Sequence, residues 1–291
     1  MEVTPLVPHS FCYGVAKAIE LAEKAIEENK GKKVYLIGNL VHNEIVMDSL
    51  KEKGLIAISE KENDLYGFLK TLPPQSVIVF SAHGHSESFD EIANNKKFKI
   101  YDATCSFVKE NLSFIKDAVK KNENTIYIGK KGHIECEAAL SISHQKVELI
   151  DEKSGVYPTF PCDEMVNVIC QTTLSLEEIN KAKDYINSHY QKHNFVAQRC
   201  LATEIRQRSI EKVDDSCDLI VILGSQTSNN SLELYELAVR LFGKNKKVIM
   251  ALDKNELEKF DLGGYKKASL ASGASTAPKT FDEAYKYLLS I

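Results

Sequence analysis

Three of the seven cysteines in this 291-residue chain are almost evenly spaced. Cys12, Cys105 and Cys200 are separated by 93 and 95 positions, and each comes just before a segment with helical character. The free N–H groups at the start of a helix stabilise a thiolate, which is the form of cysteine that binds metals. One cysteine at the same joint of three similar units predicts a single metal site near a pseudo-threefold axis. Three thiolates would leave one coordination position of that site open for a substrate.

The spacing of the cysteines does not select the metal. The chain contains no CxxC pair and lacks the usual ferredoxin run of cysteines. Zinc held by three cysteines and a water fits the residues, and so does a four-iron cluster with one corner that is not bound by cysteine. The remaining cysteines are interpreted as buried and chemically inert side chains; they are Cys136, Cys162, Cys170 and Cys217.

Short β-branched runs alternate with longer amphipathic stretches along the chain, and these are the elements that must position the cysteines. Strands are predicted over residues 32–38, 76–82, 98–103, 124–129, 146–151, 165–170, 217–224, 246–252 and 266–273. Helices are predicted over residues 16–28, 112–121, 176–188 and 231–242. Near-continuous apolar strands indicate parallel sheets that are buried on both faces. We therefore expect an α/β fold of three domains, at residues 1–103, 104–198 and 199–291.

Polar residues follow directly after six of the predicted strands. Ligands of parallel α/β sheets bind at the carboxyl ends of the strands, and helix starts in these loops favour anions. Imidazole, hydroxyl and amide groups with few lysines or arginines predict a pocket for a phosphate or diphosphate. The motifs GxxxxGK[ST] and GxGxxG are absent, which argues against a P-loop and a standard dinucleotide site. The candidates are His42, His83, His85, His133, Thr172, Thr173, Ser228, Asn229, Asn230, Ser231, Ser275 and Thr276.

Glu135 is an acid placed two residues after the strand-end His133, and it is the natural candidate for a proton donor. A single histidine in such a loop is more often a hydrogen-bonded structural residue. A Ser/Asn cluster before a helix is usually an N-cap. The combination of three spaced cysteines with six polar strand ends favours a functional site over these separate structural explanations.

Composition argues against several other classes of function. The net charge is −4 and the chain has no basic stripe or tail, so we expect no nucleic-acid partner. No run approaches 18 apolar residues, so we expect no membrane span. The first residues lack a basic segment followed by an apolar one, and seven is an odd number of cysteines. These features predict a cytoplasmic protein with reduced thiols.

Taken in order, the motifs of the chain resemble those of the IspH/LytB family of 4-hydroxy-3-methylbut-2-enyl diphosphate reductases. This family carries out the last step of the non-mevalonate isoprenoid route. The resemblance begins at residue 11 and extends to the motif that starts at residue 272. The segments that carry it are FCYGV, VHNEIV, FSAHGHS, DATCSFV, IGKKGHIE, CQTTLS, RCLATEIRQ, SQTSNNS and SGAST.

The resemblance implies a cloverleaf of three α/β domains around a central [4Fe–4S] cluster. It implies that Cys12, Cys105 and Cys200 are the cluster ligands and that the fourth iron is open to the hydroxyl oxygen of the substrate. Glu135 would deliver a proton, and the Thr172 hydroxyl would take part in the same relay. The implied substrate-binding residues, which include the diphosphate site, are His42, His83, His133, Thr172, Ser228, Asn229, Asn230 and Ser275.

The reaction implied by the resemblance removes an allylic hydroxyl group as water, with two electrons and two protons. Its products are isopentenyl diphosphate and dimethylallyl diphosphate. A ferredoxin or flavodoxin would supply the electrons. Two alternatives stay open at this stage. One is a diverged family member that acts on another unsaturated alcohol or diphosphate, and the other is a non-catalytic regulator that binds zinc or a cluster.

The chain departs from the usual family motifs at several positions next to the predicted ligands. Tyr13 follows the first cysteine where Ala or Phe is usual, and Ser106 follows the second in place of Pro. Ile134 replaces the Pro between His133 and Glu135, and Arg199 and Asn229 are also unusual. None of these changes removes a predicted cluster ligand or the predicted proton donor, so they bear on the shape of the pocket.

Overall fold

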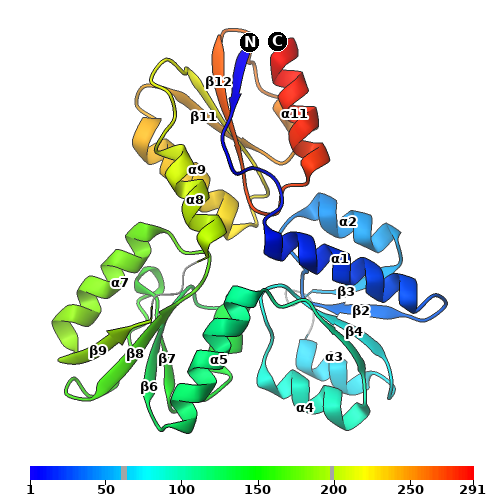
Figure 1. The fold of residues 1–291 in the computed structure, drawn as a ribbon, viewed down its shortest axis with the longest axis vertical. Helices are drawn as coiled ribbons and strands as arrows, with labels where there is room; N and C mark the ends of the chain where they lie inside the picture. Colours follow the sequence, from blue (N-terminus) through cyan, green and yellow to red (C-terminus); the bar gives the residue numbers. More distant parts are fainter. Residues whose placement is uncertain (60–63, 197–199) are drawn as a thin grey trace. The chain divides into compact units, whose positions relative to one another are not determined.

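The structure is a computed structural model that describes residues 1–59, 64–196 and 200–291. Its strands form three four-stranded sheets, and every strand pairing within them is parallel (Figure 1). All nine predicted strands and all four predicted helices are present, with ends that differ by a few residues. The expectation of an α/β fold with three similar parallel sheets is therefore confirmed.

One sheet has the strand order β3-β2-β4-β5 and a second has the order β7-β6-β8-β9. In the third sheet the order is β11-β10-β12-β1, so the first strand of the chain completes the sheet of the last segment. The strands of the first sheet are β2 (Val34–Ile37), β3 (Leu55–Ile58), β4 (Val77–Phe80) and β5 (Lys99–Asp102). Those of the second are β6 (Asn124–Ile128), β7 (Val147–Ile150), β8 (Met165–Cys170) and β9 (Lys192–Phe195). Those of the third are β10 (Leu219–Leu223), β11 (Lys247–Ala251), β12 (Lys267–Ser272) and β1 (Glu2–Pro5).

The three sheets share one topology. Numbered from its first strand, each sheet reads 2-1-3-4, with β1 taking the place of the fourth strand in the third sheet. In the sheets of β2 and β6, the connections leave the first and third strands in opposite directions, which is where open parallel sheets form a ligand-binding crevice at their carboxyl ends. The loops after β2, β4, β6, β8, β10 and β12 start at these points.

Helices connect the strands and cover the sheets. The helices are α1 (Tyr13–Glu28), α2 (Glu44–Glu52), α3 (Leu65–Thr71), α4 (Glu87–Lys96), α5 (Ser106–Lys120), α6 (Ile134–Leu140), α7 (Leu176–His189), α8 (Leu201–Ile210), α9 (Asn229–Phe242), α10 (Lys254–Leu257) and α11 (Pro278–Ser290). A single 3-10 turn covers Glu152–Ser154 among the described residues. Local sequence fixes several helix starts. Ser175 and Glu178 form a reciprocal capping box at α7, and Pro278 occupies the first turn of α11.

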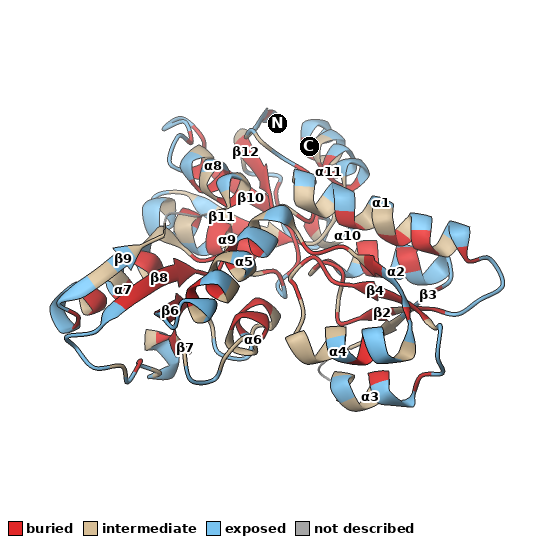
Figure 2. Cartoon of the chain, turned by 60° about the horizontal axis from the view of Figure 1, so that its bottom comes forward, coloured by how far each residue is buried: buried red, intermediate tan, exposed pale blue. Residues whose placement is uncertain are grey.

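The central strands are buried on both faces, as their apolar sequences predict (Figure 2). In β10, alternate residues face opposite layers, because side chains of a strand point to its two faces in turn. Leu219, Val221 and Leu223 pack with Phe281 and Leu288 of α11. The intervening residues pack with α8 and α9, in a cluster that contains Ile220, Ile222, Ile210, Leu234 and Ala238.

Contacts divide the chain into two compact units. The first unit comprises Met1–Ala16, Val41–Asp48 and Cys200–Ile291 and contains the sheet of β1, β10, β11 and β12. The second comprises Lys17–Leu40 and Ser49–Arg199 and contains the other two sheets. Within the first unit the two ends of the chain meet, since the Met1 amino group donates a hydrogen bond to the Leu288 carbonyl at 3.4 Å.

Candidate functional site

The three evenly spaced cysteines occupy equivalent positions in the topology. Cys105 follows β5, Cys200 follows β9 and Cys12 follows β1, which are the fourth strands of their sheets. Cys105 and Cys200 are the N-caps of α5 and α8, and Cys12 directly precedes α1. All three thiols are partly exposed.

In the first unit, Cys12 is held against the loop that follows β12. Its N–H donates to the Ala274 carbonyl at 3.0 Å. The Val15 N–H donates to the Cys12 sulfur at 3.4 Å, so the start of α1 directs a backbone donor at the thiol. The Cys12 sulfur therefore lies at the N-terminal end of α1, beside a backbone N–H donor.

Arg206 connects the segments that carry Cys12 and Cys200. One terminal nitrogen of its guanidinium donates to the Ser10 carbonyl at 2.6 Å and the other donates to the Ala202 carbonyl at 3.1 Å. Only 2% of the side chain is exposed. Burial lowers the pKa of the Arg206 guanidinium, and the Cys12 and Cys200 thiols act in the opposite direction. Arg206 is thus a buried cation close to both Cys12 and Cys200.

The predicted diphosphate residues of the first unit form one hydrogen-bonded set of loops. Ser228 is the N-cap of α9, and its hydroxyl oxygen accepts from the Ser231 N–H. The Asn230 side chain accepts from the Ala274 N–H at 2.8 Å and donates to the Thr203 hydroxyl at 3.2 Å. The loops after β10 and β12 are thereby fixed to the helix that begins after Cys200.

Ser275 and His42 are also brought together in this unit. The Ser275 hydroxyl donates to the His42 backbone carbonyl at 3.3 Å. Glu44, two residues after His42, accepts from the Ser225 hydroxyl at 2.9 Å and from the Thr227 hydroxyl at 3.1 Å. The sequence did not predict this role of Glu44, although the residue lies inside the motif VHNEIV.

The second unit brings His83, Cys105 and His133 into one region. The Cys105 N–H donates to the carbonyl of Ala82, the residue before His83, at 3.0 Å. The rings of His83 and His133 meet edge to face with centroids 5.8 Å apart. Gly84 has a φ of +87°, and a side chain there would press on α5 and α6 as well. The close approach of this loop to both helices therefore depends on glycine.

One ring nitrogen of His133 caps a helix. Its Nδ1 accepts a hydrogen bond at 3.1 Å from the Glu135 N–H and caps α6. In the neutral imidazole the proton must then lie on Nε2, so this nitrogen is a hydrogen-bond donor. A donor of this kind suits an anionic oxygen.

Glu135 is buried at the first turn of α6, with 1% of its surface exposed. Its Oε1 accepts from the Thr172 N–H and from the Tyr127 hydroxyl, both at 2.9 Å. Its Oε2 is 2.9 Å from the Thr172 hydroxyl. Burial raises the pKa of Glu135 to about 7, although these three hydrogen bonds act to lower it. Such a carboxyl group can give up a proton near neutral pH, as a general acid must.

Every predicted site residue lies within the described part of the chain, in one of two sets. The first unit contains Cys12, His42, Cys200, Ser228, Asn229, Asn230 and Ser275. The second contains His83, Cys105, His133, Glu135 and Thr172. His85 is a structural residue, because it stacks on Phe80 and bonds Asp90. Arg199, which departs from the family motif, lies outside the described residues.

Among the other cysteines, one expectation was wrong. Cys136, Cys170 and Cys217 are buried as predicted, but Cys162 is exposed. It lies in the loop before β8, where no packed element covers it. Burial raises the pKa of the Cys136 thiol well above its ordinary value, so this neighbour of Glu135 stays protonated.

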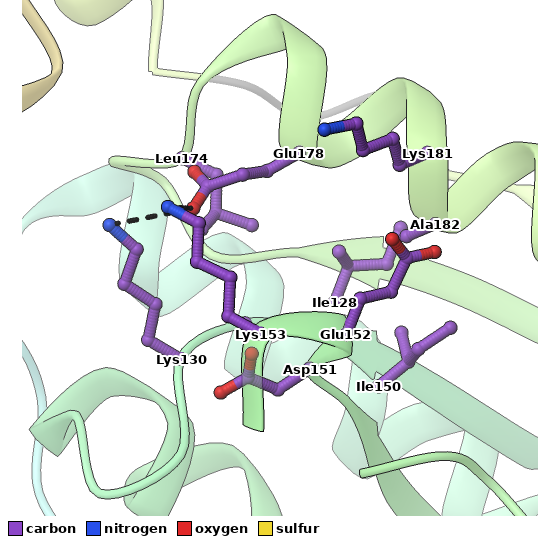
Figure 3. A pocket seen from close by; sticks show the side chains of 11 residues that line it. Ile128, Lys130, Ile150, Asp151, Glu152, Lys153, Leu174, Glu178, Lys181 and Ala182 are labelled. Carbon is purple, nitrogen blue, oxygen red and sulfur yellow. Dashed lines mark ion pairs between the residues drawn. The ribbon is translucent and has the colours of Figure 1, made fainter. Parts of the chain in front are cut away.

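A cavity of about 230 Å³ lies in the second unit, between α7 and the ends of β6 and β7 (Figure 3). None of the predicted site residues lines it. Lys130 and Lys153 both form ion pairs with Glu178, at 3.7 and 2.8 Å. These pairs partly neutralise the lysines on the cavity wall, so the cavity offers less positive charge to an anion than its composition implies.

Two further observations bear on cofactor and membrane binding. Over residues 1–59, 64–196 and 200–291, no three His, Cys, Asp or Glu side chains form a group that could hold a metal ion. Cys12 and Cys200 belong to the first unit and Cys105 to the second. Within the same residues, no helix has both the length and the apolar character that a membrane span requires.

The chain is similar to known proteins over nearly its full length. The model of a family described as "LytB protein" matches residues 3–289. The 4-hydroxy-3-methylbut-2-enyl diphosphate reductase of Bacillus pumilus is 30% identical over 289 residues, which cover 99% of this chain and 90% of that protein. The protein of the same name from a Polaromonas species is 32% identical and covers 94% of this chain and 80% of its own length.

Solved structures agree with these sequence comparisons. The E-1-hydroxy-2-methyl-but-2-enyl-4-diphosphate reductase of Plasmodium falciparum superposes with a TM-score of 0.86 and 26% identity. The match covers all of this chain and 88% of that one. A structure of (E)-4-hydroxy-3-methyl-but-2-enyl diphosphate reductase gives a TM-score of 0.71 at 23% identity, which bears on the fold alone.

Proposed function

The chain belongs to the LytB protein family, and on this premise we propose that it is a 4-hydroxy-3-methylbut-2-enyl diphosphate reductase. The reaction would take up two electrons and two protons, break the bond between C4 and its hydroxyl oxygen, and release water. The organic products would be isopentenyl diphosphate and dimethylallyl diphosphate. Two relatives that cover at least 94% of the chain carry this activity in their names, which supports the proposal.

The observation that carries the chemistry is the buried carboxyl group of Glu135. A departing hydroxyl group leaves as water only if it receives a proton. Glu135 has a pKa raised to about 7 and has the Thr172 hydroxyl next to its Oε2. We assign Glu135 as the proton donor and Thr172 as the hydroxyl that passes the proton on.

The cysteines fit an iron–sulfur cluster as its ligands. Cys12, Cys105 and Cys200 are partly exposed thiols at helix starts, and thiolates are the ligands that such clusters use. The buried Arg206 guanidinium beside Cys12 and Cys200 compensates negative charge there. We propose that these cysteines hold a [4Fe–4S] cluster with one iron that has no cysteine ligand. When bound, the cluster would supply the electrons and Lewis-acid chemistry at the leaving hydroxyl group.

The diphosphate would be held by neutral donors rather than by a cluster of lysines. Ser228, Asn229 and Asn230 lie at the start of the 14-residue helix α9, whose free N–H groups favour an anion. His42 and Ser275 lie in the loops packed against that helix start, and the neutral His133 ring carries its proton on Nε2. His83 would share the site with His133, whose ring it contacts.

A one-electron carrier would deliver the electrons one at a time. We propose a ferredoxin or a flavodoxin for this role, and a cytoplasmic location. Purified candidates can be compared by the rate at which each reduced carrier supports product formation. A carrier that reduces the protein but supports no turnover would be rejected as the donor.

The proposed role of Glu135 is tested by Glu135→Gln, with Glu137→Gln as the matched control. Both acids lie on α6, but Glu137 is exposed. Removal of a general acid costs roughly 10²–10⁴ in rate, so we expect Glu135→Gln to lose that much of kcat with unchanged iron content. Glu137→Gln should retain wild-type turnover. Near-normal kcat in Glu135→Gln would overturn the assignment.

The cluster is tested by iron and sulfide analysis after anaerobic purification. We expect about four of each per chain, and loss of most of both when any of Cys12, Cys105 or Cys200 is changed to Ser. The exposed Cys162 provides the control, because Cys162→Ser should leave the iron content unchanged. A colourless protein that retains zinc would instead indicate a zinc site. Faster turnover of another unsaturated alcohol would indicate a diverged relative.

A further inference from the structure

Tyr127 is a tyrosine in the middle of the buried strand β6, and the reaction proposed above gives it no role. It has no exposed surface. Its hydroxyl group donates to Glu135 Oε1 at 2.9 Å. The ring packs in a cluster with Ile115 of α5 and Cys136 of α6. A buried phenol without water must donate to a protein acceptor, and here that acceptor is the proposed proton donor.

The ring of Tyr127 has little freedom to move. Gly129 lies two residues further along the chain, and a Cβ at this position would overlap the Cys136 sulfur. The same Cβ would lie 3.1 Å from the Tyr127 ring. The missing side chain at Gly129 therefore allows the sulfur and the ring to pack closely, and this packing holds the phenol against Glu135.

The two oxygens of Glu135 have different partners. Oε1 accepts from the Thr172 backbone N–H, which can only donate, and from the Tyr127 hydroxyl. Oε2 faces the Thr172 hydroxyl, which can either donate or accept. An oxygen that accepts two hydrogen bonds serves as the carbonyl oxygen of a protonated carboxyl group. The acidic proton then belongs on the other oxygen.

We infer that Tyr127 is a positioning residue that, with the Thr172 N–H, fixes Oε1 of Glu135 as the carbonyl oxygen and so places the transferable proton on Oε2. This proton lies beside the Thr172 hydroxyl. It can pass to that oxygen as the threonine gives its own proton onward, which leaves a carboxylate on Glu135. The inference rests on the proposed role of Glu135, and it adds which oxygen releases the proton and what selects it.

Two titratable groups next to this carboxyl, Tyr127 and Cys136, keep their own protons at neutral pH. Burial, together with the negative charge of Glu135, raises the pKa of Tyr127 well above its ordinary value. Burial also raises the pKa of Cys136. Cys170 at the end of β8 adds to the rise in the pKa of Tyr127, and Glu137 and Asp151 add to the rise in the pKa of Cys136. Tyr127 and Cys136 thus remain hydrogen-bond donors at neutral pH.

The test is the carbonyl stretching band of protonated Glu135 in infrared difference spectra between acidic and alkaline pH. The band is assigned by its absence in Glu135→Gln. Tyr127→Phe removes the hydroxyl group and keeps the ring, so the band should move to higher wavenumber because its carbonyl oxygen loses one of two donors. Tyr190→Phe is the control. Tyr190 is also a buried tyrosine, and its hydroxyl donates to the Pro158 carbonyl.

Turnover provides the second readout. Tyr127→Phe should lower kcat roughly tenfold and leave KM unchanged. A tenfold change in rate corresponds to the free energy of about one hydrogen bond. It should have no further effect in the Glu135→Gln background. If Tyr127→Phe is insoluble, Tyr127→Met removes the same hydroxyl group and should shift the band in the same direction.

An unshifted carbonyl band in the folded tyrosine variant overturns the inference, and so does a shift of equal size in Tyr190→Phe. Neither result affects the proposed function, which fails separately if Glu135→Gln retains full turnover. The spectra do not depend on activity, so the two failures can be told apart.

Discussion

Glu135 differs in one respect from acids such as Asp102 that pair with lysine in this chain. Its hydrogen-bond donors are a phenol, a hydroxyl and a backbone N–H, and none of them is a cation. Asp102 is 2.7 Å from the Lys109 ammonium, and its pKa is lowered. Neutral donors position a carboxyl group without the strong charge stabilisation that a cation provides. Glu135 can therefore carry a proton near neutral pH, and Asp102 cannot.

This difference predicts a pH dependence of turnover. With a pKa raised to about 7, Glu135 is protonated below that pH and loses its proton above it. We expect kcat to fall roughly tenfold per pH unit above about pH 7, since a general acid acts only when protonated. The measurement is kcat of wild type and Glu137→Gln with a chemical reductant whose potential is held constant. A flat profile from pH 6 to pH 9 would contradict the assignment.

The same shift predicts a pH dependence of stability. In the unfolded chain Glu135 has its ordinary pKa near 4.5, so between pH 4.5 and about 7 the folded protein binds more protons than the unfolded chain. The free energy of unfolding should therefore fall as the pH rises through this window, and Glu135 should account for up to about 3 kcal/mol of the loss. Urea unfolding of wild type minus Glu135→Gln at pH 5 and pH 8 isolates the contribution. A difference that rises with pH would have the wrong sign.

Arg206 carries a second prediction at the level of single residues. Its replacement by Met leaves the Ser10 and Ala202 carbonyls without their charged donor. We expect the free energy of unfolding to drop by on the order of 3 kcal/mol, with faster loss of iron. Arg208→Met on the same helix is the control, because that side chain is 64% exposed and should cost less than about 1 kcal/mol. Equal effects of the two changes would argue against the role of Arg206.

The sequence predicted the candidate site residues, but it did not predict the contacts that Tyr127 and Arg206 make beside them. Tyr127 lies in an apolar run and looks like core packing, because nothing local shows that its hydroxyl group meets Glu135. Arg206 looks like a surface cation on a helix, because its partners Ser10 and Ala202 are backbone carbonyls. Contacts to backbone atoms and contacts across a fold leave no pattern in residue types. The only signal for Arg206 in the sequence was its position in the motif RCLATEIRQ, which resembles the family.

At the level of elements, the repeated feature is a cysteine after the fourth strand of each sheet. Nine strands could be predicted from short apolar or β-branched runs in the sequence, and the central ones, such as β4, β6 and β10, are fully buried. The three strands that were not predicted are β1, β3 and β9, each of four residues. They lie at sheet edges, and β1 and β9 are largely polar. An edge strand buries one side only, so its sequence has no continuous apolar run.

The pairing of β1 with β12 could not be predicted for a further reason. The two strands are about 265 residues apart in the sequence, and their register joins Val3 to Ala268. A parallel pairing leaves no turn motif between its strands. Only the complete fold shows that the segment before Cys12 is the fourth strand of the last sheet, which makes the three cysteines equivalent.

This pairing gives a prediction for β1. Val3 is the one buried residue of the strand, whereas Thr4 is exposed. Val3→Asp buries an unpaired charge against the core of the third sheet, so we expect a loss of roughly 2–4 kcal/mol of stability together with cluster loss. Thr4→Asp should change stability by less than about 0.5 kcal/mol. Circular dichroism and iron analysis measure both. Equal behaviour of the two variants would argue against the observed pairing.

For the molecule as a whole, the proposed chemistry needs all three sheets. Each sheet contributes one cysteine, and the remaining predicted residues come from loops after the first and third strands of every sheet. The family model matches residues 3–289, so the match includes strands of all three sheets. A single sheet with its helices would therefore carry only one of the three proposed cluster ligands and only part of the proposed substrate site.

The most direct test of this account is anaerobic turnover. Purified protein with its iron restored is reduced chemically, mixed with 4-hydroxy-3-methylbut-2-enyl diphosphate and analysed by mass spectrometry. We predict isopentenyl diphosphate and dimethylallyl diphosphate from wild type, and roughly 10²–10⁴-fold slower formation of both from Glu135→Gln. Reduced, iron-loaded wild type that leaves the substrate unchanged would contradict the proposed function.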